Sequence, residues 1–293
     1  MQANDYVAAR SVDEAIATLQ RGGGQNRLLA GGSDVIVQVR EGRRAVDTFV
    51  DVKTIPEASV LSYDPKEGLR VGAATSCVRI YEDDTVRRLY PALVDSASLI
   101  GSVQIQSRAT LGGNLCNSSP AADTIPTLLV LGATAHIAGP KGWRTVPVAE
   151  FCTAPGRNVL APDELLVALV FPPPTPRSGA FFLRFIPRNE MDIAVVNAAA
   201  WIVLDQAMQT ITDARIAVGA VAPTPLLVKA AADAIIGQPA TEETFARAAE
   251  AAVAAARPIS DMRGTAGQRK HLTGVLTRRA LAGALTRARE ANA

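Results

Sequence analysis

Two pairs of adjacent glycines are the residues of this sequence best suited to hold an anion. Gly31–Gly32 is followed by Ser33, and Gly112–Gly113 is preceded by Thr110. A backbone without Cβ atoms can approach an anion closely and direct its N–H groups at it, and a following helix adds the positive end of its dipole. Neither segment contains a lysine, and neither matches the GxGxxG fingerprint or the P-loop pattern. The two segments could grip one pyrophosphate from two sides, or each could be only a tight turn, and spacing alone leaves both open.

The hydrophobic pattern predicts the elements that would position these glycines. Ser11 and Glu14 form a capping box that begins a helix. Short apolar runs predict strands at residues 27–30 and 49–52, and a helix begins at residues 35–39 after a Ser/Asp cap. Beyond them we expect a hairpin over residues 60–74, a helical region over 78–100, an apolar segment at 124–131, and strands at 133–138 and 165–171.

A run of prolines after the last of these strands marks the clearest break in composition. Pro172, Pro173, Pro174 and Pro176 cannot lie inside a sheet or helix and stiffen a connector, so a domain boundary is predicted there. Beyond it the pattern predicts strands at residues 181–185, 194–204 and 214–220, and helices at 224–236, 241–257 and 267–289.

Composition excludes several classes of protein. The chain has 293 residues, a length that favours two domains. Its formal net charge of +2 argues against a surface that binds nucleic acid or an anionic membrane. Its three cysteines are far apart and form no C-x-x-C pair, which argues against a disulfide framework, a zinc site or an iron–sulfur cluster held by this chain alone. No apolar run is long enough to span a bilayer and no secretory signal is evident, so a cytoplasmic location is expected.

An ordered series of short motifs resembles one protein family. Residues 30–34 and 110–114 are similar to the two FAD pyrophosphate motifs in the flavoprotein (medium) subunits of the xanthine dehydrogenase and carbon monoxide dehydrogenase family of molybdenum hydroxylases. Residues 119–123, 191–196, 219–225 and 258–264 resemble later signatures of the same family, in the same order. Any one motif is weak, but the ordered set is specific and covers nearly the whole chain.

The resemblance implies an α+β architecture. Residues 1–175 would form a two-lobed FAD-binding domain like that of the vanillyl-alcohol-oxidase (PCMH-type) superfamily, with a small lobe at about 1–56 and a larger lobe at about 57–175. Residues 176–293 would form a small C-terminal α+β domain with an antiparallel sheet and helices. The implied partners are a small subunit with 2Fe-2S clusters and a large molybdopterin subunit, assembled as a dimer of heterotrimers. This chain would pass electrons from the clusters through non-covalent FAD to an external acceptor, without a catalytic residue or metal of its own.

The resemblance also implies roles for individual residues. Arg184 stands where relatives usually carry a lysine close to the flavin, and Asp123 would bind near the ribityl chain. Cys116 and Asn117 would lie near the isoalloxazine ring, and Leu165 and Leu166 would pack against it. The phosphates, ribose and adenine would be contacted by Leu28, Leu29, Ala30, Gly31, Gly32, Ser33, Asp34, Val35, Ile100, Gly101, Ala109, Thr110, Gly112, Gly113 and Asn114.

One departure from the family and three rival functions remain open at the level of sequence: a stand-alone flavin enzyme, a protein that binds a different nucleotide, and a structural subunit with a degenerate site. Ser33 replaces a histidine that carbon monoxide-oxidising relatives carry, which weighs weakly against that substrate. A stand-alone FAD-dependent oxidoreductase would use the same grip on the cofactor but would need its own acid or base, for which no candidate is evident. Because the substrate binds to the large subunit in this family, the sequence of this chain identifies neither the substrate nor the electron acceptor.

Overall fold

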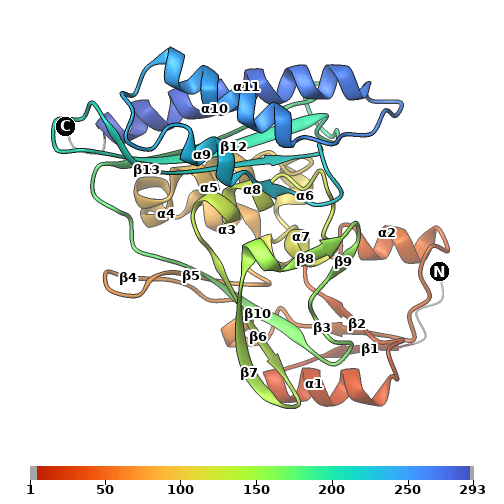
Figure 1. Cartoon of the computed structure of the whole chain (residues 1–293). Helices are drawn as coiled ribbons and strands as arrows, with labels where there is room; N and C mark the ends of the chain where they lie inside the picture. Colours follow the sequence, from red (N-terminus) through yellow and green to blue (C-terminus); the bar gives the residue numbers. More distant parts are fainter. Residues whose placement is uncertain (1–4, 291–293) are drawn as a thin grey trace.

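The computed structural model describes residues 5–290, and within them the strands form four sheets (Figure 1). The first is a small parallel sheet in the order β1-β3-β2, built from β1 (Asp5–Ala8), β2 (Arg27–Leu29) and β3 (Thr48–Asp51). Its helices are α1 (Val12–Arg21) and α2 (Val35–Arg40). The predicted N-cap of α1 is confirmed, because Ser11 Oγ accepts a hydrogen bond from the Glu14 amide (3.1 Å). The Glu14 carboxylate accepts from the amide of Arg10 (2.7 Å), one residue before the cap, and not from that of Ser11 as in a capping box.

A five-stranded antiparallel sheet forms the second layer. Its order is β4-β5-β10-β6-β7, with β4 (Leu61–Asp64), β5 (Gly68–Gly72), β6 (Thr134–Gly139), β7 (Gly142–Pro147) and β10 (Leu165–Phe171). A short pair, β8 (Cys152–Ala154) and β9 (Arg157–Asn158), lies between β7 and β10 in the chain, after the 3-10 turn η2 (Val148–Glu150). The turn η1 (Pro56–Ala58) precedes β4, and the helices that follow β5 are α3 (Cys77–Glu82), α4 (Asp84–Leu89), α5 (Pro91–Ala97), α6 (Val103–Gln106), α7 (Leu111–Asn117) and α8 (Ile125–Val130).

The C-terminal part is a four-stranded antiparallel sheet between two layers of helices. The sheet runs β11-β12-β13-β14, with β11 (Ser178–Phe185), β12 (Val196–Leu204), β13 (Ile211–Gly219) and β14 (Leu226–Leu227). Figure 1 shows α10 (Glu242–Ala255) and α11 (Ala266–Glu290) over one face, while α5 and α8 contact the other; α9 (Lys229–Asp233) lies against β13. Every residue of β12 is buried, which explains why its sequence is apolar apart from Asn197.

Two predicted helical regions differ from the structure. The region at 78–100 is divided into α3, α4 and α5, because Asp83 caps α4 through the amide of Val86 (2.9 Å) and Pro91 begins α5. The helix expected at 224–236 is wrong over its first turn: residues 226–227 pair with β13 as β14, and only the five residues of α9 are helical. Pro225 disfavours a helical conformation of Thr224, the residue before it.

Candidate functional site

The two glycine pairs lie in one cleft with a volume of about 870 Å³. This volume is in the upper part of the range of about 300–1,000 Å³ that is typical of small-molecule sites. The cleft lies between the segment from β2 to α2, the first turns of α7, and the β8–β9 pair. The predicted residues that line it are Leu28, Ala30, Gly31, Gly32, Ser33, Asp34, Val35, Ile100, Ala109, Thr110, Gly112, Gly113, Asn114, Cys116, Asn117 and Leu166.

The first glycine pair is shaped by close packing of backbone. A Cβ at Gly31 would lie 2.2 Å from the carbonyl oxygen of Arg108, so this glycine allows the segment after β2 to touch the segment before α7. Gly32 has a φ of +78°, a conformation that favours glycine, and its carbonyl accepts the Ile36 amide (3.1 Å) where α2 begins. Burial raises the pKa of the neighbouring Asp34. Both glycines are therefore required by the turn itself.

Lys53 holds the first glycine segment in place, although it belongs to none of the motifs identified in the sequence. Its Nζ donates to the carbonyl oxygen of Ala30 (3.1 Å) and to Asp51 Oδ2 (2.6 Å). The Tyr6 hydroxyl donates to the same carboxylate (2.6 Å). Asp51 is buried, and although burial opposes ionisation, these hydrogen bonds hold its pKa below the usual value.

The second glycine pair forms the first turn of α7, and its two members differ in role. The Thr110 hydroxyl caps the helix by accepting the Gly113 amide (2.8 Å). A Cβ at Gly112 would lie 2.5 Å from the Cβ and the carbonyl oxygen of Ala73, so Gly112 is needed for packing against β5. Gly113 is exposed in the cleft, and a Cβ there would approach only the Thr110 hydroxyl, at 3.0 Å. Gly113 is thus the glycine whose open face is available to a ligand.

The remaining wall joins α2, α7 and β9. Gln38 Nε2 donates to Asn117 Oδ1 (3.4 Å), and Asn158 Nδ2 donates to the carbonyl oxygen of Cys116 (2.8 Å). Thr124 donates to Asn114 Oδ1 (2.6 Å), which fixes the amide of that side chain. Burial raises the pKa of Cys116 to about 12, so this side chain is a neutral thiol and not a thiolate nucleophile.

Five predicted site residues are not among those that line the cleft. Leu29 and Leu165 are buried in apolar clusters, because side chains alternate along a strand and their neighbours Leu28 and Leu166 face the cleft instead. Gly101 forms the turn before α6 with a φ of +58°. Asp123 and Arg184 pair with each other in a buried site where β11 meets the segment between α7 and α8.

Charged residues that the sequence did not single out also line the cleft. They are Arg27, Arg43, Arg44, Arg157 and Glu164, of which Glu164 is paired with Arg144 (2.6 Å). Arg27 Nε is buried without a hydrogen-bond partner, and burial lowers the pKa of this guanidinium. These arginines are far apart in the sequence and form no recognisable motif, so only the fold brings them together. They give the cleft the cationic groups that the glycine segments lack.

Comparisons with known proteins agree with this architecture. Residues 2–174 match the family described as FAD binding domain in molybdopterin dehydrogenase, and residues 181–284 match the CO dehydrogenase flavoprotein C-terminal domain. The xanthine dehydrogenase FAD-binding subunit of Escherichia coli O157:H7 is 33% identical over 265 residues, 90% of each chain. The carbon monoxide dehydrogenase medium chain of Hydrogenophaga pseudoflava is 30% identical over 285 residues, 97% of each chain.

Solved structures are similar over the same extent. Carbon monoxide dehydrogenase from Hydrogenophaga pseudoflava superposes with a TM-score of 0.92 at 29% identity, over 97% of each chain. Quinoline 2-oxidoreductase from Pseudomonas putida 86 gives a TM-score of 0.90 at 29% identity, over 99% of this chain and 98% of that one. Fold and cleft thus define a flavoprotein of the oxidoreductase class. The chain belongs to the family of FAD-binding (medium) subunits of molybdenum-dependent hydroxylases and dehydrogenases.

Proposed function

We propose that the cleft holds FAD through both glycine segments and that the chain works as the electron-transfer subunit of a heterotrimeric molybdenum hydroxylase. The observation that carries this proposal is the open face of Gly113 opposite the fixed turn at Gly32, both lining one cleft of dinucleotide size. The residues proposed to contact the cofactor are the predicted ones that line the cleft, together with Arg27, Arg43, Arg44 and Arg157.

The residues present fit a dinucleotide with two phosphates. Gly113 leaves room for a group that a Cβ would displace, and Arg27 offers a buried, unpartnered N–H beside the cleft. FAD, when bound, supplies a two-electron carrier that can exchange electrons one at a time with iron–sulfur clusters. The chain's own part is to fix the cofactor's position, through Lys53 on one segment and the Thr110 cap on the other, and to exclude water with Leu28, Ile100 and Leu166.

The organisation of the chain and its complex is proposed on the same basis. We place a PCMH-type FAD-binding domain at 1–175, with lobes at about 1–56 and 57–175, and a C-terminal domain at 176–293. This division is supported by the change of sheet between β10 and β11.

Relatives are medium chains of multi-subunit enzymes, which supports a small iron–sulfur subunit and a large molybdopterin subunit as partners in a dimer of heterotrimers. Free Cys77, Cys116 and Cys152 support a reducing, cytoplasmic location.

The test is the visible absorption spectrum of the purified chain, followed by identification of the chromophore that heat releases. The expected result is the two-banded spectrum of oxidised flavin, with about one FAD per chain in the supernatant. A colourless chain that takes up no added FAD, whether isolated or within its complex, would contradict the proposal. No helix among residues 5–290 is long and apolar enough to cross a bilayer.

A further inference from the structure

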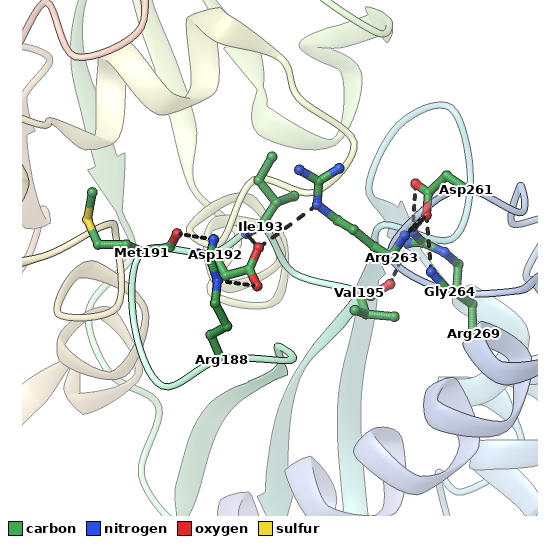
Figure 2. Close-up of polar contacts among 9 residues, drawn as sticks. All are labelled: Arg188, Met191, Asp192, Ile193, Val195, Asp261, Arg263, Gly264 and Arg269. Carbon is green, nitrogen blue, oxygen red and sulfur yellow. Dashed lines mark hydrogen bonds and ion pairs between the residues drawn. The ribbon is translucent and has the colours of Figure 1, made fainter.

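Two surface loops of the C-terminal part lie against each other. One is the β11–β12 loop, residues 186–195, and the other is the α10–α11 loop, residues 256–265. Arg263 Nε lies 3.9 Å from Asp192 Oδ1, and a Cβ at Gly264 would lie 3.2 Å from a methyl group of Val195. Figure 2 shows Arg263 extending toward Asp192, the residue before Ile193, where the loops meet. The two loops therefore form one continuous surface.

This surface presents large apolar side chains to solvent. Met191 and Ile193 on the first loop are 53% and 50% exposed, and Ile259 and Met262 on the second are 71% and 92% exposed. We call these four residues the two-loop patch. Single exposed apolar residues are common, but several on two loops that contact each other are typical of a surface that binds another protein. Methionine is enriched at such surfaces because its flexible thioether adapts to a partner.

A buried arginine fixes the two loops. The Arg269 side chain is 5% exposed; its Nη1 donates to the carbonyl oxygens of Val195 (2.6 Å) and Ala220 (3.1 Å), and its Nη2 donates to both carboxylate oxygens of Asp261 (2.8 and 2.9 Å). Figure 2 shows the contacts of Arg269 with Val195 and Asp261, together with the contact of Arg188 to Asp192 (3.3 Å). Arg188 also donates to the carbonyl oxygen of Met191, which has a left-handed φ of +56°. Loops held in this way need little further ordering when a partner binds.

The loops that carry the patch are linked by hydrogen bonds to the chain segment that follows the cleft wall. Arg184 and Asn197 face each other across the β11–β12 pair, at the base of the first loop, and both contact Asp123. Asn197 Nδ2 also donates to the carbonyl oxygen of Ala122 (3.2 Å). The Ala220 amide donates to the carbonyl oxygen of Pro120 (2.7 Å), and Arg269 holds the carbonyl group of Ala220. Residues 118–123 directly follow α7, whose Cys116 and Asn117 line the cleft. One set of contacts thus connects the patch to the cleft wall.

We infer that the two-loop patch is the docking surface for the iron–sulfur subunit. This inference rests on the proposed function. Electron tunnelling weakens steeply with distance, so the subunit that carries the clusters must dock beside the cleft and be held there in one orientation. A rigid apolar surface anchored on residues 118–123 meets both needs. The exposed apolar residues Leu227 and Ile236 lack these contacts with residues 118–123 and serve as matched controls.

The test uses the native complex, purified through an affinity tag on this chain, with iron and FAD measured in the product. Ile193→Asp combined with Met262→Asp places two charges in the patch without altering a residue of the cleft. We expect FAD per chain to match the wild type and iron per FAD to fall by about tenfold or more, as for residues central to an interface. Leu227→Asp combined with Ile236→Asp should leave both ratios unchanged. The milder pair Ile193→Ser and Met262→Ser should give an intermediate loss of iron.

Several results would overturn the inference. The patch does not bind the iron–sulfur subunit if the charged double variant retains wild-type iron per FAD. Loss of the large subunit with iron retained would assign the patch to that subunit, and a wild-type isolated chain that dimerises only when the patch is intact would assign it to a second copy. Absence of FAD from the wild-type complex would instead contradict the proposed function, so the two failures are distinguishable.

Discussion

The guanidinium group of Arg184 forms an ion pair with the carboxylate of Asp123, and this pair joins β11 to the segment between α7 and α8. The two side chains are 5% and 11% exposed. Burial raises the pKa of Asp123 to about 6, although the charge of Arg184 and hydrogen bonds from Asn197 and Arg184 oppose this shift. The positive charge of Arg184 is therefore compensated by the carboxylate of Asp123. We expect the pair to hold the two parts of the chain together more than it sets the potential of a flavin.

Arg184→Met should destabilise the chain strongly. Removing one partner of a buried pair leaves the other charge buried and uncompensated, which costs about 3–5 kcal/mol. Urea unfolding at pH 8 measures the loss of unfolding free energy. A double-mutant cycle with Asp123→Asn separates the interaction energy of the pair from the effect of each single substitution. Lys229→Met is the control, because Lys229 is 85% exposed and its surface pair with Asp233 is worth only about 0–1 kcal/mol. A loss for Arg184→Met no larger than for this control would contradict the structural role of the pair.

The stability of the chain should contain a component from Asp123 that decreases as the pH rises from about 4 to about 6. The pKa in the folded state is about 6 and the ordinary value is 3.8, so the folded chain binds more protons than the unfolded chain in this window. Stability falls with rising pH wherever the folded state holds the extra proton. The measurement compares the free energy of unfolding of the wild type and Asp123→Asn at several pH values. A difference that is constant across the window would show that the pKa is not raised.

Gly113→Val should abolish retention of FAD while the chain still folds. The position is exposed in the cleft, where an added Cβ meets only the Thr110 hydroxyl, so the branched side chain extends into the space proposed for the cofactor. FAD content after gel filtration measures the effect, with thermal unfolding as the check on folding. Gly267→Val is the control, because a Cβ there has no neighbour closer than 3.9 Å and lies outside the cleft. Stoichiometric FAD in Gly113→Val would exclude the second glycine segment from the site.

Lys53→Met should weaken FAD binding by about tenfold, which corresponds to the loss of about one charge-assisted hydrogen bond. The change frees the carbonyl group of Ala30 and removes a cation from buried Asp51, so the first glycine segment loses its tether. Titration of the FAD-free chain with FAD, followed by quenching of flavin fluorescence, gives the dissociation constant. Lys66→Met, in the exposed turn between β4 and β5, should bind FAD as the wild type does. Equal constants for all three chains would show that the tether does not act on the cofactor.

The sequence predicted elements whose signal is local. The apolar run at residues 165–171 forms β10, and the helix expected at 267–289 is α11. The helix expected at 224–236 was wrong at its start because the partner of β14 is β13, a choice made by tertiary contacts. The short strands β1, β7, β8 and β9 were not predicted, since they are stabilised by neighbours distant in sequence and carry little alternation.

The cleft could be predicted as far as its glycines carry a pattern. Both segments lie in it, but the role of each glycine could not be inferred, because the contacts of Gly31 with Arg108 and of Gly112 with Ala73 exist only in the folded chain. Leu28 and Leu29 have the same chemistry, and only the orientation of β2 decides which of them faces the cleft. Lys53 could not be identified, since it acts through the backbone of Ala30 and matches no motif.

The close approach of Gly31 to the carbonyl group of Arg108 has a consequence for how the chain loses a bound cofactor. The segment after β2 and the segment before α7 touch with no side chain between them, and both line the cleft, so one cannot move away from the other without opening the cleft. Release of FAD and separation of the small parallel sheet from the rest of the chain would then be a single cooperative event. Heating should accordingly release the flavin in one sharp step that coincides with the first unfolding transition, with no gradual leak at lower temperatures.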